Sequence, residues 1–324
     1  MVKCKWCGAE GHLEEFETHP DYPDVFWCPD CDGCTRLDGN DEQEVLLILE
    51  NGGGGERAKM TAPLPALKKQ LSPLRYPGGK SKMIGDIYAR LGTEHISCFS
   101  EAFAGGASVG LSLLEAGVCD ILRLNDADPG VYAFWHTVLN KPEALLHRII
   151  QEPLPSHLTL WHSKEVLRAN TTDTADLAWA QLVVNRLSYS GIAIAGAMGG
   201  KNGSQASLLA RWNPETLAGR IRRIYDMRGR IHLTCMDGCE FIEEYGYWEK
   251  DGVLFVDPPY YEKGPQLYPL SFSEDDHCRL AGLLNDLSMQ FPGVRVIITY
   301  DDHPAIRGLY HTGNIEVLMR KYSA

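Results

Sequence analysis

The stretch DPPYY, residues 257–261, combines a carboxylate, two rigid residues and two aromatic rings directly after the apolar run 253–256. Proline cannot donate a hydrogen bond to a strand ladder, and it keeps the preceding residue out of helical geometry. We therefore expect the strand to end at Asp257. The carboxylate, the fixed carbonyl groups and the aromatic faces indicate a small pocket for a flat polar group, although a capping Asp at a Pro-rich strand end is the simpler alternative.

A second chemical pattern lies at EAFAGGAS, residues 101–108, which joins a predicted strand to a predicted helix. Glycines at such a turn let the backbone approach a ligand at the helix N-terminus. Asp126 ends the next predicted strand, where a carboxylate can bind both hydroxyl groups of a ribose. The pair predicts a nucleoside-containing cofactor, with a helix cap as the alternative role for Asp126.

The stretch RYPGGKS, residues 75–81, superficially looks like a phosphate-binding loop. That loop requires a glycine five residues before the glycine of its Gly-Lys pair, and position 74 is Leu. The sequence therefore does not support an NTPase. A Gly-Gly-Lys turn still offers close backbone approach and a cation for a carboxylate.

Two Cys-x-x-Cys pairs, Cys4 with Cys7 and Cys28 with Cys31, are separated by twenty residues. Such pairs can complete a tetrahedral zinc site, although Cys34 could replace Cys31. A unit of about fifty residues has a thin core, so we expect structural Zn²⁺ to hold it folded. Its acidity favours a protein partner, or a role in stability, over DNA contact.

The elements that must position these residues alternate along the chain. Strand-like runs occur at 96–101, 120–125, 231–236, 253–257, 294–300 and 315–319, and helical patterns at 106–117, 129–140 and 274–288. This alternation predicts an α/β fold with a mostly parallel, doubly wound sheet, in which ligands bind at the carboxyl ends of the strands.

The predicted domains are a zinc-ribbon-like module at 1–50, a flexible Gly-rich linker at 51–71 and a catalytic domain at 72–324. The region 141–236 interrupts the alternation with helical stretches at 174–188 and 214–227 around a Gly-rich loop. We therefore predict that it is an inserted, mainly helical subdomain.

Charge is distributed unevenly within a formal net charge of −12. Residues 1–50 carry three basic and thirteen acidic side chains, whereas residues 141–236 carry twelve basic and seven acidic ones. A basic region in an acidic chain is a candidate phosphate-binding surface, or else a solvated helix face. No apolar run is long enough to span a membrane and no secretory signal is evident, so we expect a cytoplasmic protein with cysteines as thiols or metal ligands.

The motifs RYPGGK, EAFAGGAS, Asn125-Asp126 and DPPY occur in this order. Together they resemble the D12 class of DNA adenine-N6 methyltransferases, in which the cofactor half precedes the target-recognition region and the catalytic motif follows it. The resemblance covers about residues 72–324. Further matching stretches are NRLSYSG at 185–191, RWNP at 211–214, FSEDDH at 272–277 and YDDHP at 300–304.

The resemblance implies a Rossmann-like sheet, S-adenosylmethionine as methyl donor and double-stranded DNA as partner. Carried over by position, the cofactor-binding residues would be Tyr76, Gly78, Gly79, Lys80, Glu101, Phe103, Gly105, Gly106, Asp126, Asp237 and Asp257. Asp126 would bind the ribose and Asp237 the adenine of the cofactor. The insert would read DNA, with Arg186, Arg211, Arg222 and Arg223 as the predicted DNA-binding residues.

The resemblance also assigns a catalytic role to Asp257, Pro258, Pro259 and Tyr260. The Asp257 carboxylate and the Pro258 carbonyl would accept hydrogen bonds from the exocyclic amine of adenine, so that the nitrogen lone pair points at the methyl group. Tyr260 would stack on the base, which must leave the duplex to reach such a pocket.

Two departures from the family pattern stand out. Ala102 and Ala107 occupy positions where the family often has Pro and Gly, and alanine is small enough that we still expect cofactor binding. The family's sheet usually ends with a further antiparallel strand, and the given sequence stops at Ala324, soon after 315–319, so this strand is either absent or lies beyond the given residues.

Alternatives remain at this stage. An N4-cytosine methyltransferase would present the same acceptors to another exocyclic amine, and a zinc-bearing DNA-binding or interaction protein without catalysis is the alternative from a different class. The resemblance leaves the recognition sequence, a restriction partner and the oligomeric state open. It places the source in bacteria or their phages.

Overall fold

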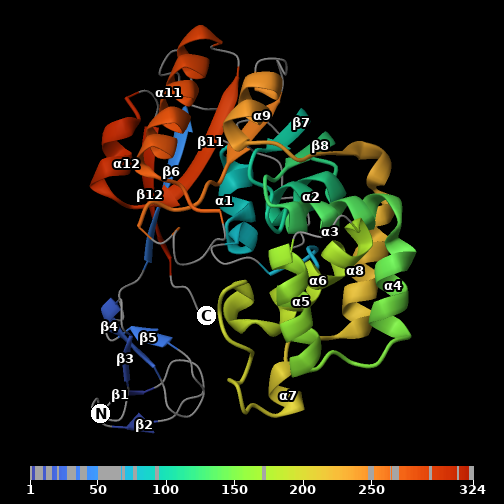
Figure 1. The fold of residues 1–324 in the computed structure, drawn as a ribbon. Coiled ribbons are helices and arrows are strands. Elements are labelled where there is room, and N and C mark those ends of the chain that lie inside the picture. Colours follow the sequence, from blue (N-terminus) through green and yellow to red (C-terminus); the bar gives the residue numbers. More distant parts are fainter. Residues whose placement is uncertain are drawn as a thin grey trace.

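The computed structural model describes residues 2–3, 10–11, 17–19, 22–27, 34–36, 42–49, 67, 70–75, 79–91, 95–169, 173–246, 252–262, 264, 270–291, 294–311 and 314–320. A seven-stranded sheet forms its centre, in the order β12-β6-β11-β10-β7-β8-β9 (Figure 1). The strands are β6 Glu42–Leu49, β7 Ile96–Glu101, β8 Cys119–Asn125, β9 Ile231–Thr234, β10 Val253–Val256, β11 Arg295–Asp301 and β12 Asn314–Arg320.

Strands β11, β10, β7, β8 and β9 pair in parallel, which confirms the predicted doubly wound sheet. In the sheet, β8 and then β9 follow β7 on one side, whereas β10 and then β11 lie on its other side. The order therefore reverses at β7, and the carboxyl ends of β7 and β10 form the crevice where such sheets bind ligands.

Strand β6 is the main surprise. It lies between β11 and β12 and is antiparallel to both, with Val45 opposite Tyr300 and Val317. Figure 1 shows this blue strand among the red strands of the C-terminal part. The predicted boundary of the N-terminal module at residue 50 is therefore wrong, because residues 42–49 belong to the large sheet. They also give the sheet an antiparallel strand that the sequence analysis did not find.

The described helices are α1 Ile84–Ala89, α2 Ser108–Glu115, α3 Pro129–Asn140, α4 Pro142–Ile150, α5 His157–Ala169, α6 Thr174–Leu187, α7 Gln205–Leu208, α8 Pro214–Asp226, α9 Gly238–Tyr245, α11 Glu274–Gln290 and α12 Pro304–Leu309. The predicted helices 129–140, 174–188, 214–227 and 274–288 each match one of these within two residues. Short 3₁₀ turns lie at η2 Lys80–Lys82, η3 Tyr189–Gly191 and η4 Arg228–Arg230.

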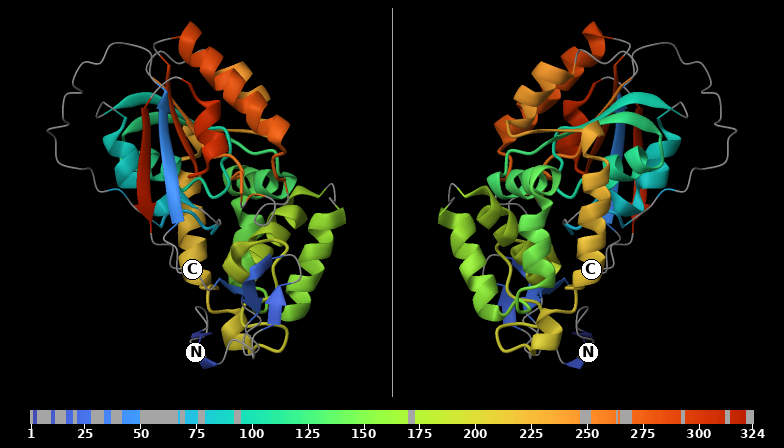
Figure 2. Two further views of the ribbon diagram at one scale, coloured as in Figure 1. Left: turned by 90° about the vertical axis from the view of Figure 1, so that its left-hand side faces the viewer. Right: turned by 90° about the vertical axis from the view of Figure 1, so that its right-hand side faces the viewer.

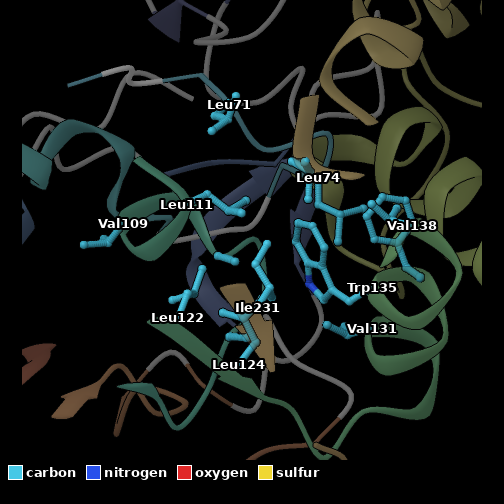
Figure 3. Close-up of a cluster of buried hydrophobic side chains, with 14 of the residues drawn as sticks. Leu71, Leu74, Val109, Leu111, Leu122, Leu124, Val131, Trp135, Val138 and Ile231 are labelled. Carbon is cyan, nitrogen blue, oxygen red and sulfur yellow. The ribbon is translucent and has the colours of Figure 1, made fainter. Parts of the chain in front are cut away.

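Each face of the sheet carries its own apolar cluster. Val253 and Phe255 of β10 point to one cluster, and Leu254 and Val256 point to the other, as the two-residue repeat of a strand requires. The first cluster is covered by α1, α2, α3 and the insert, and Figure 3 shows part of it around Trp135. The second cluster is covered by α9, α11 and α12. Both faces of the parallel strands are therefore buried.

The helices α4 to α8 form the predicted insert between β8 and β9. Figures 1 and 2 show them gathered at the end of the molecule away from α11 and α12. Helix α6 is its centre, since every residue from Leu177 to Leu187 is buried. The predicted end of the insert at residue 236 is too late, because β9 begins at Ile231 and belongs to the sheet.

Two small sheets lie near the N-terminus, apart from the large sheet in Figure 1. They consist of β1 Val2–Lys3 with β2 Glu10–Gly11, and of β3 Glu17–His19, β4 Tyr22–Trp27 and β5 Cys34–Arg36. The predicted linker 51–71 lies mostly outside the described residues, but its end does not behave as a linker. Leu71 is buried in the first apolar cluster.

Candidate active site

The turn after β7 brings the backbone close to the sheet edge. Gly105 has a φ of 45°, and Ala107, at the N-cap of α2, has φ 47° and ψ 33°. The indole nitrogen of Trp135 donates to the Gly105 carbonyl at 2.9 Å, and the Ala104 amide donates to the Asn125 carbonyl at 2.8 Å. Two left-handed residues and two long-range hydrogen bonds therefore fix the shape of this turn.

Glu101, the last residue of β7, is buried and accepts a hydrogen bond from the Gly110 amide at 2.6 Å. Burial raises the pKa of its carboxyl to about 8, the Gly110 hydrogen bond lowers it in part, and the nearby charge of Asp257 raises it further. Gly110 is required here, because a Cβ would lie 2.8 Å from the Glu101 carboxylate and 2.3 Å from Leu122.

Asp126 follows β8 and lies against the cofactor turn. Its two carboxylate oxygens accept hydrogen bonds from the Gly105 amide at 2.7 Å and the Asp128 amide at 2.9 Å. Burial, followed by the charge of Asp128, raises the pKa of Asp126 to about 7, against the lowering effect of the two amides. The helix cap that was considered for Asp126 is provided by Asp128, which accepts from the Gly130 and Val131 amides at the start of α3.

Asp257 begins the loop after β10 and lies in a polar cluster with three partners. Its Oδ1 is 2.7 Å from the Lys80 ammonium and 2.6 Å from the Thr299 hydroxyl, which donates to it. The same Lys80 ammonium donates to the Tyr260 hydroxyl at 2.6 Å. Lys80 is 3 % exposed, so this buried cation and Asp257 form an ion pair whose geometry is fixed by neighbouring hydroxyl groups.

A cavity of about 400 Å³ opens at the carboxyl ends of β7, β8 and β10. Asp237 borders it from the start of α9, where it accepts from the Cys239 and Glu240 amides and pairs with Arg279 at 3.1 Å. The predicted residues that line it are Gly79, Lys80, Glu101, Phe103, Gly105, Gly106, Asp126, Asp237, Asp257 and Pro259. The fold therefore gathers most of the predicted site from separate parts of the chain.

The cavity also has an apolar side. The rings of Phe103 and Phe272 meet edge to face with their centroids 5.6 Å apart. Gly238 leaves room for them, since a Cβ there would lie 2.3 Å from the Phe103 ring. A cavity lined by both carboxylates and aromatic rings suits a ligand with both a ribose and a flat base.

The sequence comparisons agree with this geometry. Residues 76–324 match the family described as D12 class N6 adenine-specific DNA methyltransferase. The chain belongs to this family. Members of this family are DNA adenine-N6 methyltransferases, and membership implies S-adenosylmethionine as the methyl donor.

Two relatives of this methyltransferase carry matching names. A DNA N-6-adenine-methyltransferase of Escherichia phage P1 is 26 % identical over 276 residues, which are 81 % of this chain and 34 % of the phage protein. A DNA adenine methylase of Vibrio cholerae is 25 % identical over 265 residues, which are 78 % of this chain and 89 % of that protein. The match thus spans about a third of the phage protein and most of the Vibrio protein.

Some predicted site residues of the methyltransferase lie elsewhere. Tyr76 and Gly78 are outside the described residues. Pro258 and Tyr260 are buried and do not line the cavity in this structure, although the Tyr260 hydroxyl contacts Lys80. Lys80 was predicted to bind the cofactor, and here its ammonium lies 2.7 Å from the predicted catalytic residue Asp257.

The predicted DNA-binding arginines have different surroundings. Arg186 is 5 % exposed and donates to the Pro73 carbonyl, so its burial does not fit a contact with DNA. Arg223 is exposed and paired with Glu115. Arg222 is exposed, and Arg211 is partly buried. The exposed basic surface that the charge pattern predicted is therefore made by fewer residues than expected.

Two fully buried polar residues beside the site were given no role by the sequence analysis. Asn125 was quoted only as part of the Asn125-Asp126 motif, and Thr299, inside β11, was not named. Asn125 bridges three backbone groups, as its amide donates to the Ala102 and Met236 carbonyls and its oxygen accepts from the Met236 amide. Isolated polar residues in the runs DILRLN and VRVIITY are the signal that could have indicated them.

The predicted zinc ligands Cys4, Cys7, Cys28 and Cys31 all lie outside the described residues. Within the described part of the chain, no group of three or more His, Cys, Asp or Glu residues is arranged to hold a metal ion. In the same part, no helix is both long and apolar enough to cross a membrane.

Proposed function

We propose that this methyltransferase transfers the methyl group of S-adenosylmethionine, bound in the cavity, to N6 of an adenine flipped out of double-stranded DNA at a specific site. The observation that carries the proposal is the polar cluster in which Lys80 and Asp257, both of which line this cavity, contact Tyr260 and Thr299. A carboxylate whose orientation is set by these contacts supports the proposal that Asp257 receives the target base beside the cofactor.

The residues around the cavity suit this cofactor. Asp126 offers acceptors for ribose hydroxyl groups, and Phe103 offers an apolar surface for the adenine of the cofactor, near Asp237. Glycines in the turn at Gly105 and Gly106 keep side chains away from the bound molecule, and a Cβ on Gly106 would meet no atom closer than 3.7 Å. S-adenosylmethionine supplies a methyl group on a positively charged sulfur, which is a good leaving group.

The protein's contribution to the reaction is orientation of the target amine. The lone pair of this amine is delocalised into the adenine ring, so the nitrogen is a weak nucleophile. The Asp257 carboxylate and the Pro258 carbonyl would each accept a hydrogen bond from one N–H group of the amine. These two bonds favour a pyramidal nitrogen. The methyl donor would leave as a neutral thioether once its methyl group is bound to N6, and the proton released from the amine would pass to the Asp257 carboxylate or to water.

Lys80 and Thr299 hold Asp257 in this geometry. Two donors on the same carboxylate oxygen fix the plane of the group, which preorganises the acceptor before the base arrives. The positive charge of Lys80 also compensates the carboxylate in a cavity from which a bound base would exclude water. In this proposal Lys80 therefore contributes to catalysis by orienting Asp257 and compensating its charge.

DNA binding is assigned to the helical insert. Arg211, Arg222 and Arg223 are proposed to contact phosphates, and the basic balance of 141–236 supports this.

The N-terminal cysteines Cys4, Cys7, Cys28 and Cys31 are proposed to hold one structural zinc ion, and their spacing supports this. Zinc analysis of the purified chain should give one equivalent. Less than about half an equivalent would contradict the site.

The decisive experiment is methyl transfer to unmethylated plasmid DNA, followed by mass spectrometry of the nucleosides. N6-methyladenine is expected, whereas N4-methylcytosine would overturn the adenine assignment. Asp257→Asn should retain the fold, because an amide oxygen can still accept from Lys80, but should lose most activity in single-turnover assays. Activity near that of the unmodified protein would show that Asp257 only terminates the strand.

A further inference from the structure

The segment 71–75, which we call the lead-in segment, lies between the helical insert and the cofactor turn. Leu71 and Leu74 are buried in the first apolar cluster, and Figure 3 shows Leu74 next to Trp135. A Cβ on Gly106 would lie 3.7 Å from both the Leu74 carbonyl and the Ser72 hydroxyl. The lead-in segment therefore touches the cofactor turn on one side.

On its other side, the lead-in segment is held by the insert. Asn185, near the end of α6, makes two hydrogen bonds to the backbone of Arg75: its Oδ1 accepts from the amide at 2.7 Å, and its Nδ2 donates to the carbonyl at 2.6 Å. A side-chain amide that satisfies both backbone groups of one residue fixes the position and direction of the chain there.

Two arginines extend this hold over the neighbouring residues. Arg186 donates to the Pro73 carbonyl, and Arg220 of α8 donates to the Ser72 carbonyl at 3.0 Å. These contacts join residues separated by more than 100 positions in the sequence. Asn185, Arg186 and Arg220 thus form a clamp on the lead-in segment.

The clamp is unusual in its chemistry. Asn185 is 2 % exposed and Arg186 is 5 % exposed, although a buried guanidinium is costly unless it is well paired. Burial lowers the pKa of Arg186 to about 9, with smaller lowering by the charges of Arg220, Arg75 and Arg211. An apolar side chain could fill such a space at lower cost. The polar groups therefore serve to fix the segment, beyond filling the core.

The loop after α6 adds a steric contact to the clamp. Gly191 has a φ of 79°, and a Cβ there would lie 2.4 Å from the Arg75 carbonyl oxygen. A side chain at this position would collide with the same backbone group that Asn185 holds. The insert and the lead-in segment are therefore in direct contact over two consecutive structural elements, α6 and η3.

Lys80 follows Arg75, the last residue of the lead-in segment, by five positions in the sequence. Gly79 and Lys80 line the cavity, and the Lys80 ammonium is 2.7 Å from Asp257. A displacement of the insert would thus be transmitted both to the cofactor turn, through Gly106, and to the chain that carries Lys80.

We propose that Asn185, Arg186 and Arg220 are positioning residues that couple DNA binding by the insert to cofactor binding and to the placement of Lys80. The inference rests on the proposed function, in which the insert binds DNA. Coupling between two sites is reciprocal, so DNA should tighten cofactor binding by the same factor by which cofactor tightens DNA binding.

The test measures the dissociation constant of S-adenosylhomocysteine, the form of the cofactor that has no methyl group to transfer, by calorimetry with and without saturating unmethylated plasmid DNA. The unmodified protein should bind the cofactor about five-fold or more tightly with DNA, which is the lower range of such couplings. Asn185→Ala should bring this ratio close to one and lower kcat. Without DNA its cofactor affinity should change by less than about three-fold.

A matched control is Asn285→Ala, which removes a similar amide-to-carbonyl hydrogen bond, from Asn285 of α11 to Leu309, at the other end of the molecule. It should retain the coupling ratio of the unmodified protein. If Asn185→Ala does not fold, Arg220→Ala removes one contact of the clamp from a partly exposed side chain and should lower the ratio to a smaller extent.

Two results would overturn the coupling. One is an unmodified protein whose cofactor affinity is the same with and without DNA. The other is an unchanged ratio in folded Asn185→Ala or Arg220→Ala, which would make the clamp a purely structural contact. Failure of the proposed function has a different signature, namely that the unmodified protein binds no S-adenosylmethionine or methylates no adenine.

Discussion

Ala107 carries backbone strain at the centre of the cofactor turn. Its φ of 47° lies in the left-handed region, which costs a residue with a Cβ roughly 1 kcal/mol or more relative to glycine. Ala107→Gly should therefore relieve about 1 kcal/mol of strain, and because the more flexible unfolded chain offsets roughly 0.4–1 kcal/mol of this, we expect a net stabilisation of at most about 0.6 kcal/mol.

Urea denaturation monitored by circular dichroism would measure this gain. Ala116→Gly is the matched control, because Ala116 ends the same helix with an ordinary φ of −75° and should gain nothing from glycine. A loss of stability in Ala107→Gly would mean that contacts of the Ala107 methyl group outweigh the strain.

Glu101 gives the protein a distinctive pH dependence. An unfolded chain ionises this carboxyl near pH 4.5, whereas the folded protein ionises it near pH 8. Between these values the folded state holds one more proton, so the free energy of unfolding must fall as pH rises and level off above about pH 8. Asp126, with its pKa raised to about 7, adds to the same trend.

Glu101→Gln should flatten this decline, since the neutral amide keeps an acceptor for the Gly110 amide and does not ionise. Thermal unfolding of the cofactor-free protein between about pH 5.5 and 8.5 measures it. The exposed Glu143→Gln serves as control and should follow the unmodified protein. Equal slopes in all three proteins would show that Glu101 does not titrate in this range.

Residue types and spacing predicted the lining of the cavity well, but they did not predict the partners inside it. Glu101, Asp126, Asp237 and Asp257 could be found because acids at strand ends meet at one edge of a parallel sheet. The bond from Lys80 to Asp257 could not be found this way, because 177 positions separate the two residues. Arg186 was misassigned for a related reason, since a basic segment does not reveal which arginine points inward.

At the scale of elements, strand β6 shows that part of the N-terminal region belongs to the large sheet. Local pattern placed all the parallel strands correctly, because each is an apolar run bounded by a turn or a helix. Residues 42–49 were assigned to the cysteine-rich module because they follow it in sequence. Their partners, β11 and β12, lie some 250 residues away, and no local signal indicates such pairing.

This topology predicts different outcomes for two truncations. Removal of residues 1–41 keeps β6 and should leave the large sheet and cofactor binding in place. Removal of residues 1–49 separates β11 from β12 and exposes unpaired backbone along a long edge of each strand, which favours aggregation. Leu47, Ile48 and Leu49, which are buried in the two apolar clusters, would also be lost.

Solubility, thermal unfolding and cofactor affinity of the two truncated proteins test this expectation. The shorter truncation is the control for the longer one, because both lack the cysteine pairs. A soluble and folded protein without residues 1–49 would show that β6 is dispensable.

At the scale of the whole molecule, an acidic protein must bind an acidic polymer. The net charge of −12 repels DNA, so binding depends on the local basic balance of the insert. Figures 1 and 2 place the insert at one end of the molecule, away from α11 and α12, and this separation allows one surface to attract DNA while the rest does not.

Salt dependence reveals which arginines meet phosphates, because each neutralised phosphate adds roughly 0.9 to the slope of log affinity against log salt. Arg222→Ala should lower the slope by about this amount, measured by fluorescence anisotropy with a duplex oligonucleotide. Arg223→Ala should lower it less, since Glu115 already pairs with that guanidinium. Arg307→Ala is the control, because Arg307 lies on α12, outside the insert, where it pairs with Asp302. An unchanged slope for Arg222→Ala together with a reduced slope for Arg307→Ala would move the DNA-binding surface from the insert to the opposite end of the molecule.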